Sequence, residues 1–356
     1  MVAHVPAKSQ VRLKTSALLV TPALAWRSVS VPCRMLWPMV ALWADPWNPE
    51  FGMGFEAPLE EATSHRADPF VETEDWSRAI VAPPRAKPVP VWFVDGVRRV
   101  ELRVLADEGD RRIPGLFGSF AVGTVLCDGR AAFGEHRVGR ALILGGGMMP
   151  DGVVLPCGRA ALDFQPVADP SPDPNGQIER LQRLMRDAED AIAAMLVLSG
   201  ASLVLADGPL RLGHDGGLPV VGVVKRFVRR YLEPVHEALL ARLRPGERTP
   251  IFALIDQDGA VRGYSWYTRL VTLQRPWHDR AGIVRFEVRA MLGPDQARNM
   301  ADSVSGFLPG YAGRPTDPRA PQNLAPVGGL ESWLRHRMGD HAMIRRTLVA
   351  WLAAKE

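Results

Sequence analysis

Two short apolar runs, each closed by an Asp-Gly step, organise this sequence: Val91-Trp92-Phe93-Val94-Asp95-Gly96 and Ser202-Leu203-Val204-Leu205-Ala206-Asp207-Gly208. Runs of this length that are rich in β-branched and large apolar residues are typical of buried strands. Each strand is therefore expected to end in a carboxylate. Carboxylates at the tips of neighbouring strands can hold hydrated Mg²⁺ or Mn²⁺, which prefer oxygen ligands. Because Asp-Gly is also a common turn dipeptide, two tight turns are the alternative interpretation.

Length, apolar content and cysteine spacing limit the possible folds and the cellular location of the protein. The chain has 356 residues, of which 47% are hydrophobic, enough for one large domain or two modest ones. No run approaches the roughly eighteen uncharged apolar residues of a membrane span. The three cysteines are far apart and show no CxxC pairing. This pattern argues against a zinc site or a disulfide framework and favours a reducing, cytoplasmic location.

The first 38 residues differ from the rest of the chain in charge. They contain five basic residues and no acidic one, so the overall net charge of +4 leaves −1 for the remaining residues. The excess of positive charge therefore gives no argument for nucleic-acid binding by the body of the chain. A signal peptide is disfavoured because Pro22 interrupts the apolar stretch and Arg27 follows it. We expect a disordered or artefactual leader over 1–38, with translation starting at Met39.

The remaining chain is predicted to form an irregular N-terminal arm over 39–90 and a single domain over 91–356. Proline, glutamate and tryptophan occur in the arm without a clear period. The domain is expected to begin with a meander of three strands. The first ends at Asp95, the second covers 97–106, where apolar and charged residues alternate, and the third covers 115–127.

The most regular helical pattern lies at 177–199. Apolar residues recur there at three- and four-residue intervals, and Gly200 ends the pattern. At 100° per residue, Glu189 lies at the edge of the apolar stripe, where it can reach over a sheet edge. A solvated glutamate is the ordinary alternative, but this helix leads straight into the strand that ends at Asp207.

The order strand, strand, strand, helix, strand, with carboxylates on the first strand, the helix and the fourth strand, resembles that of ribonuclease-H-like nucleases. We therefore expect an α/β fold with a ribonuclease-H-like mixed sheet flanked by helices. Four stretches resemble, in their order, the NurA nuclease family: Val94-Asp95-Gly96-Val97-Arg98-Arg99, Leu205-Ala206-Asp207-Gly208-Pro209-Leu210, Val221-Gly222-Val223-Val224-Lys225-Arg226 with Tyr231, and Val284-Arg285-Phe286-Glu287. The resemblance covers roughly residues 90–350.

The resemblance implies Mn²⁺- or Mg²⁺-dependent hydrolysis of DNA, with 5′-to-3′ exonuclease and single-strand endonuclease activity. It also implies a homodimer that works beside a HerA-type hexameric ATPase in DNA end resection and repair. The chemistry agrees with the residues, because two metals about 4 Å apart need clustered carboxylates to hold them. The predicted metal ligands are Asp95, as the bridging group, and Asp207 and Glu189 on either side of it.

Basic and aromatic residues complete the predicted site. Lys225 is expected to neutralise phosphate charge, and Tyr231 to orient the nucleophile or stack on a base. A solvated lysine and a partly buried core tyrosine are the alternatives. The predicted nucleic-acid contacts are Arg98, Arg99, Lys225, Arg226 and Arg230. A basic run that interleaves with aromatic residues suits single-stranded DNA, although a solvated helix face is the commoner reason for such a run.

One motif departs from the family pattern. The family carries a metal-binding histidine in a Pro-x-x-Leu-x-x-Ala-His segment, whereas this chain has Pro321-Gln322-Asn323-Leu324-Ala325-Pro326-Val327-Gly328. Gly328 therefore stands where the histidine is expected. Asn323, Glu331 and His336 are candidates to replace it, or the site lacks that ligand. His336 lies in a predicted amphipathic helix and is more typical of a surface residue.

Three functions follow from these patterns. The first is a metal-dependent DNA nuclease. The second is a non-catalytic NurA-like subunit that clamps DNA for an ATPase. The third is an actin-like sugar kinase, which also uses strand-end Asp-Gly steps but needs glycine-rich phosphate loops. The triple glycine at 145–147 lacks the following Gly-Lys-Ser/Thr of such a loop, so the kinase ranks last.

Overall fold

The computed structural model describes residues 42–44, 66–83, 90–212, 219–225, 230–272, 280–313 and 324–355. The chain divides into Met1–Met39, none of whose residues is described, and a second unit, Val40–Glu356, which holds all the described residues. The leader predicted over 1–38 lies outside the described residues. Within the described part of the chain, no helix is long and apolar enough to cross a membrane.

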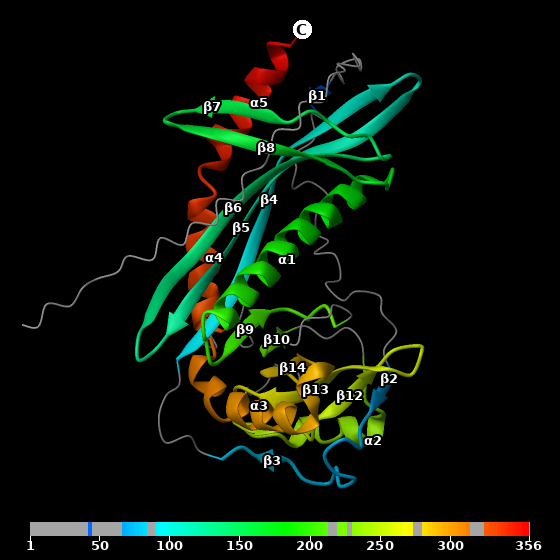
Figure 1. Ribbon diagram of the computed structural model, residues 1–356, viewed down its shortest axis with the longest axis vertical. Helices are drawn as coiled ribbons and strands as arrows, with labels where there is room; N and C mark the ends of the chain where they lie inside the picture. The colour runs from blue at the N-terminus through cyan, green and yellow to red at the C-terminus, as the bar shows by residue number, and fades with distance from the viewer. Residues whose placement is uncertain are drawn as a thin grey trace, which may run out of the picture. The chain divides into compact units, whose positions relative to one another are not determined.

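The second unit is built on a large mixed sheet with helices on both faces (Figure 1). An antiparallel meander forms its centre, from β4 (Val91–Glu108), β5 (Arg111–Cys127) and β6 (Ala131–Leu144). After helix α1 (Pro174–Leu198), strand β9 (Val204–Asp207) pairs in parallel with β4. The next strand, β10 (Val220–Val224), pairs in parallel with β9. The expected mixed α/β architecture is therefore present, although two further strands separate β6 from α1 in the chain.

Further strands extend the sheet on both sides of this centre, in the order β2-β12-β13-β14-β10-β9-β4-β5-β6-β8-β7. The remaining strands are β1 (Leu42–Ala44), β2 (Arg66–Asp68), β3 (Ile80–Val81), β7 (Val153–Cys157), β8 (Ala160–Ala168), β11 (Glu247–Arg248), β12 (Phe252–Ile255), β13 (Val261–Arg269) and β14 (Ile283–Arg289). The remaining helices are α2 (Pro234–Glu237), α3 (Gly293–Phe307), α4 (Ala325–Arg337) and α5 (His341–Ala353), with short 3₁₀ turns at Leu240–Arg242, Ala290–Leu292 and Leu308–Tyr311.

The first Asp-Gly step does not end a strand, so that expectation is wrong. β4 continues without a break through Asp95 and Gly96, which pair with Gly123 and Val122 of β5. The predicted second strand is the continuation of β4, and β6 completes the meander instead. The second step behaves as expected, because β9 ends at Asp207 and the following Gly208 has a φ of 93°, a value that favours glycine.

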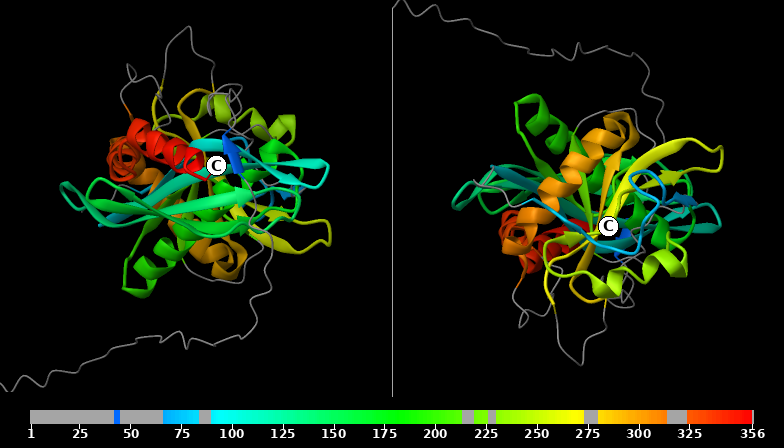
Figure 2. Two further views of the ribbon diagram at one scale, coloured as in Figure 1. Left: turned by 90° about the horizontal axis from the view of Figure 1, so that it is seen from above. Right: turned by 90° about the horizontal axis from the view of Figure 1, so that it is seen from below.

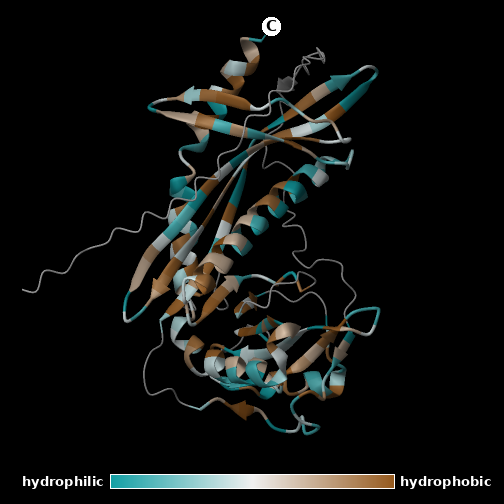
Figure 3. Cartoon of the chain, in the orientation of Figure 1, coloured by the Kyte–Doolittle hydropathy of each residue, from teal (hydrophilic) through white to brown (hydrophobic). Residues whose placement is uncertain are grey.

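Helices α1 and α4 cover opposite faces of the meander (Figure 2). α1 packs on Val94 and Val122, whereas α4 packs on the face that carries Phe93 and Val97. Figure 3 shows hydrophobic residues interspersed with hydrophilic ones along these strands. Because successive strand residues point to opposite faces, Asp95 projects towards α4 and Gly96 towards α1.

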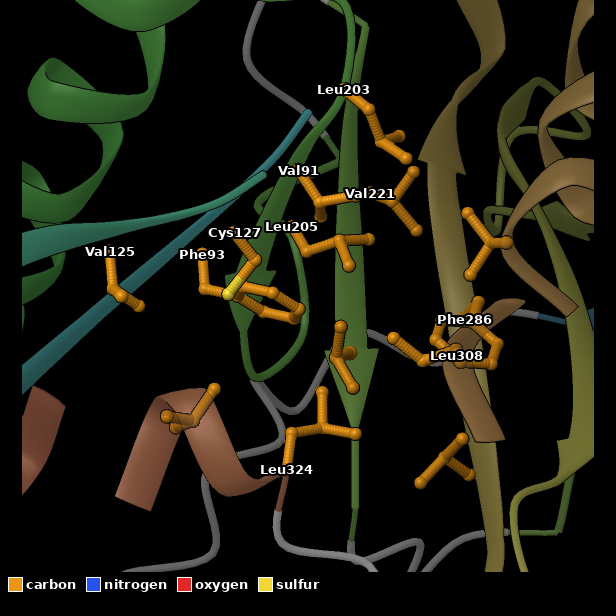
Figure 4. Close-up of a cluster of buried hydrophobic side chains, with 14 of the residues drawn as sticks. Val91, Phe93, Val125, Cys127, Leu203, Leu205, Val221, Phe286, Leu308 and Leu324 are labelled. Atoms are coloured by element: carbon orange, nitrogen blue, oxygen red, sulfur yellow. The ribbon is translucent and has the colours of Figure 1, made fainter. Parts of the chain in front are cut away.

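The core on the α4 face joins both halves of the sheet. Figure 4 shows Phe93 of β4, Val125 of β5, Leu205 of β9 and Phe286 of β14 converging with Leu324, which precedes α4. All are buried. This shared core holds β4, β9 and the start of α4 together, and it sets the positions of the polar residues at its border.

Helix α1 matches the periodic segment predicted at 177–199, with a start three residues earlier. Asp173 caps its first turn by accepting a hydrogen bond from the backbone N–H of Asn175 at 2.9 Å. Ser199 caps its end, and Gly200 follows with a φ of 89°. The apolar stripe that predicted the helix is the face that packs on β4 and β5, because Met185, Ile192 and their neighbours are buried there.

Two short strands of the predicted arm, at 66–68 and 80–81, pair with the sheet, and the residues between them are irregular. β2 pairs with β12, and β3 pairs with β11. The fully buried Arg248 donates from Nη1 and Nη2 to Glu72 at 2.8 Å, and from Nε to Asp302 at 2.7 Å. These charge-assisted bonds anchor the segment to β11. Of the rest of the predicted arm, only 42–44 and 90 are described.

Candidate metal centre

Three carboxylates from separate elements meet on the α4 face of the sheet. One oxygen from each of Asp95, Asp207 and Glu331 lies within 4.8 Å of the other two. Asp95 comes from the middle of β4, Asp207 from the end of the adjacent parallel strand β9, and Glu331 from α4. The register that pairs Val94 with Ala206 puts the two aspartates side by side. We call this set the carboxylate cluster.

Burial strongly perturbs Asp95 at the centre of the cluster. Its side chain is 5% exposed, and desolvation raises its pKa well above the ordinary value. The nearby Asp207, Glu189 and Glu331 raise the pKa further, while Lys225 opposes the shift. Asp95 Oδ1 accepts a hydrogen bond from the backbone N–H of Gly96 at 2.8 Å, but its buried Oδ2 has no hydrogen-bond partner among the described residues. A buried carboxylate oxygen without a donor, facing two more carboxylates, is a position that suits a divalent cation.

Lys225 places a positive charge beside the cluster. It follows β10 directly, and its Nζ lies 2.8 Å from each oxygen of Asp207. Burial lowers the pKa of Lys225, but the charges of Asp207 and Asp95 outweigh burial and raise it. The ammonium therefore stays charged near neutral pH. It is held where it can also meet an anionic group brought to the cluster.

Glu189 approaches β4 from the opposite face of the sheet and is not a member of the carboxylate cluster. A Cβ atom at Gly96 would lie 2.5 Å from Glu189 Oε1 and 2.8 Å from Met185 Cγ. Glycine at position 96 therefore serves close packing of α1 on β4. Glu189 is 7% exposed, and burial raises its pKa to about 7, with Arg186 opposing and Asp207 adding to the rise.

We expect Gly96→Ala to destabilise the protein, because its Cβ would displace Glu189 and Met185. Overpacking of this kind typically costs about 1–3 kcal/mol. Gly329→Ala is the matched control, since Gly329 lies in α4, lacks a positive φ and has open space around its Cβ position. Alanine there is expected to raise stability by about 0.5–1 kcal/mol. Urea denaturation measures both, and equal stability of Gly96→Ala and wild type would contradict the packing argument.

The last predicted motif contains Arg285 and Glu287, and it contacts the chain that follows Asp207. Arg285 Nη2 lies 2.8 Å from Glu287 Oε1, and both side chains are buried. Glu287 Oε2 accepts a hydrogen bond at 3.1 Å from the backbone N–H of Leu210, three residues after Asp207. This bond ties the chain beyond β9 to β14, so it helps to position the carboxylate of Asp207.

The other predicted site residues that the structure describes contact parts of the fold outside the carboxylate cluster. Tyr231 packs against Arg285, whose Cζ lies 4.4 Å from the ring centroid. Arg98 donates to Gln182 of α1 at 2.6 Å, whereas Arg99 donates to Glu101 and to the carbonyl of Gly339. As strand neighbours, Arg98 and Arg99 point to opposite faces. The exposed Arg230 lies 3.6 Å from Glu237, and Arg226 lies outside the described residues.

Three residues were candidates to replace the family histidine. Of these, Glu331 is the one that lies in the carboxylate cluster. It lies three residues after Gly328 on α4, and residues at this spacing share a helix face. His336 is exposed in the last turn of the same helix, and Asn323 lies outside the described residues. The i, i+3 relation to Gly328 was the sequence signal that favours Glu331 over the other two.

The fold and the cluster define a mixed α/β protein with a candidate metal centre. Residues 162–327 match the family model of the NurA domain. The match includes Glu189, Asp207, Lys225 and Glu287, while Asp95 precedes it and Glu331 follows it.

Solved structures with a distant likeness are two DNA complexes of endonuclease V from Ciona intestinalis. The first, with a 24mer DNA that contains an inosine followed by a ribo-adenosine, shows 10% identity and a TM-score of 0.31, and the likeness covers 70% of this chain and 86% of that chain. The second, a variant with a 23mer DNA, shows 10% identity, the same coverage and a TM-score of 0.29. A comparison with curated proteins found no match.

Proposed function

We propose that this protein is a divalent-metal-dependent DNA nuclease whose metal site is formed by Asp95, Asp207 and Glu331. The observation that carries the proposal is the convergence of three carboxylate oxygens within 4.8 Å, with Asp95 Oδ2 buried and lacking a hydrogen-bond donor among the described residues. The match of residues 162–327 to the NurA domain supports a nuclease. The strand order β6-β5-β4-β9-β10, with β4 and β9 parallel, supports assignment to the ribonuclease-H-like class.

The donor set fits a hard cation, because it offers carboxylate oxygens that Mg²⁺ and Mn²⁺ accept. When bound, the metal activates water and stabilises charge on the leaving oxygen of a phosphodiester. In this scheme Asp95, Asp207 and Glu331 would hold the ion. Lys225 neutralises the phosphate and keeps Asp207 oriented through its contact at 2.8 Å.

Glu189 has a separate role in the proposal. Burial raises its pKa to about 7, and its carboxyl group lies against Gly96 of β4, on the face opposite Asp95. It therefore supports the strand that carries Asp95. Tyr231 and the basic residues Arg98, Arg99, Arg226 and Arg230 remain proposed contacts to DNA, on the resemblance to the family.

The family resemblance extends the proposal to 5′-to-3′ exonuclease and single-strand endonuclease activity with Mn²⁺, in a homodimer that cooperates with a HerA-type hexameric ATPase in end resection. The test uses purified full-length protein, with and without that ATPase, and DNA labelled at either the 5′ or the 3′ end. Cleavage that requires Mn²⁺ and stops with chelator is expected, and the order of product lengths reports polarity. DNA binding without metal-dependent cleavage would favour the non-catalytic clamp, for which Gly328 at the histidine position is the motivating observation.

We expect Glu331→Gln to weaken Mn²⁺ binding by at least about tenfold, because the amide keeps the shape but loses the charge that holds the ion. Isothermal titration calorimetry of the DNA-free protein measures this affinity. Glu179→Gln, at an exposed position of α1, is the matched control and should bind Mn²⁺ as the wild type does. Unchanged affinity in Glu331→Gln would remove Glu331 from the metal site.

A further inference from the structure

A second surface lies next to the carboxylate cluster and combines aromatic and basic side chains. Phe133 of β6 stacks on Trp333 of α4, with ring centroids 4.8 Å apart and planes 10° from parallel. The His136 ring lies 4.7 Å from Trp333, and Arg337 Cζ lies 4.8 Å from the Trp333 ring centroid on the same helix. We call these four residues the aromatic platform. The proposed hydrolysis at the metal does not use any of them.

The aromatic platform is open to solvent. Phe133 is 48% exposed, and His136 and Arg337 are also exposed. The outer edge of β6 is free along this part, because β8 pairs only with Ala141–Leu144 and no other described strand pairs with residues 131–140 on that side. Exposed aromatic surface of this kind, beside a guanidinium, commonly marks a site of recognition.

The strand register places the aromatic platform close to the metal site. Asp95 pairs with Gly123 of β5, and Gly123 pairs with His136 of β6, so the three residues form one row on the same face. Two strand spacings separate Asp95 from His136, which is about 10 Å. Gly123 carries no side chain, and a Cβ atom there would lie 3.0 Å from Leu334 Cδ2 of α4 and 3.3 Å from His136 Cβ.

Helix α4 carries residues of both sites. Glu331 reaches the carboxylate cluster, and Trp333, two residues further, reaches Phe133 and His136. α4 contacts β4, β5 and β6, so it crosses the row from the metal site to the sheet edge. The helix therefore holds the aromatic rings at a short, fixed distance from the carboxylates.

We propose that the aromatic platform binds the bases of a single-stranded DNA segment next to the phosphate held at the carboxylate cluster. Every base has a flat face that stacks on aromatic rings, so such binding tolerates any sequence. Arg337 supplies the positive charge that backbone phosphates need. Bases within a duplex are already stacked and cannot use the platform, so it selects single strands. This inference rests on the proposed nuclease function and assigns a base-binding site to it.

The test measures DNA affinity by fluorescence anisotropy, with a fluorescein-labelled oligo-dT and a labelled duplex in the presence of chelator. Phe133→Ala is expected to weaken oligo-dT binding about tenfold and to change duplex binding less than about twofold. Phe133→Tyr keeps the ring and should bind oligo-dT as the wild type does. Phe70→Ala is the matched control, because Phe70 is 55% exposed and contacts a histidine ring, His236, outside the platform. It should leave both affinities unchanged.

Independent outcomes separate this inference from the proposed function. If wild type binds oligo-dT in a Phe133-dependent manner but does not cut, the nuclease proposal fails and the aromatic platform stands. If wild type cuts and Phe133→Ala binds oligo-dT normally, the aromatic platform is overturned and the nuclease stands. Light scattering supplies a third check. A Phe133→Ala variant that loses self-association but binds oligo-dT with unchanged affinity would identify this edge as a contact between copies of the chain, which also overturns the inference.

Discussion

Asp95→Asn is expected to abolish metal-dependent DNA cleavage while DNA binding persists. Asparagine keeps the shape of the side chain but loses the charge that holds a divalent cation, so hydrolysis should fall by orders of magnitude. DNA affinity, measured by anisotropy in chelator, depends on contacts to the DNA backbone and should weaken as salt rises in both proteins. The assay compares cleavage of labelled single strands in Mn²⁺ and in chelator.

Thermal stability distinguishes this loss of chemistry from misfolding. Asp95 is buried beside Asp207 and Glu331, and these surroundings raise its pKa. Removing its charge relieves like-charge repulsion, so the metal-free Asp95→Asn variant should melt at a higher temperature than wild type. Asp151→Asn, at an exposed position, is the matched control for both measurements. A variant that still cuts at the wild-type rate would exclude Asp95 as a metal ligand.

The stability of the metal-free protein is expected to fall as pH rises from about 5 to 8. Burial raises the pKa of Glu189 from 4.5 to about 7, so the native state holds this proton more tightly than the unfolded chain does. The resulting stabilisation is fully present below the unfolded pKa and is lost as pH rises through the folded pKa. For Glu189 it amounts to about 3 kcal/mol. Asp95, whose pKa is also raised, acts in the same direction.

Urea denaturation in chelator at several pH values measures this dependence, and Glu189→Gln should show a shallower one than wild type. Mn²⁺ is expected to oppose the trend, because the ion binds ionised carboxylates and its stabilising effect grows as protons leave the site. Equal pH profiles of wild type and Glu189→Gln would show that Glu189 titrates normally. A Mn²⁺ effect that does not change with pH would argue against a carboxylate site.

The local parts of this fold were predictable because short-range patterns determine them. The apolar spacing over 177–199 specifies α1, since its stripe is the face that packs on the sheet. Asp207 at the end of β9 follows from a short apolar run and a glycine with positive φ. The presence of a helix between the strand that carries Asp95 and the strand that carries Asp207 could also be predicted. Once β4 and β9 pair, Asp95 and Asp207 lie on adjacent strands.

The break predicted at Asp95-Gly96 shows where local reasoning fails. Glycine suggests a turn when only its neighbours in sequence are considered. In the structure Gly96 stays in an extended strand, and its missing side chain makes room for Met185 and Glu189 of a helix about ninety residues away in the chain. The requirement for glycine is therefore a tertiary packing requirement, which no window around position 96 contains.

The mixed α/β class, helix α1, the strand-end carboxylate Asp207 and the resemblance to the NurA family could all be predicted from the amino-acid sequence. Long-range packing selects the carboxylates that meet. It separated Glu189 from the cluster and brought in Glu331, a residue the sequence offered only as one of three replacements for a missing histidine. Helices α1 and α4, which carry Glu189 and Glu331, pack on opposite faces of one sheet. They do so through buried contacts between segments far apart in the chain. Which face a helix covers follows from that long-range packing, and periodicity alone does not encode it.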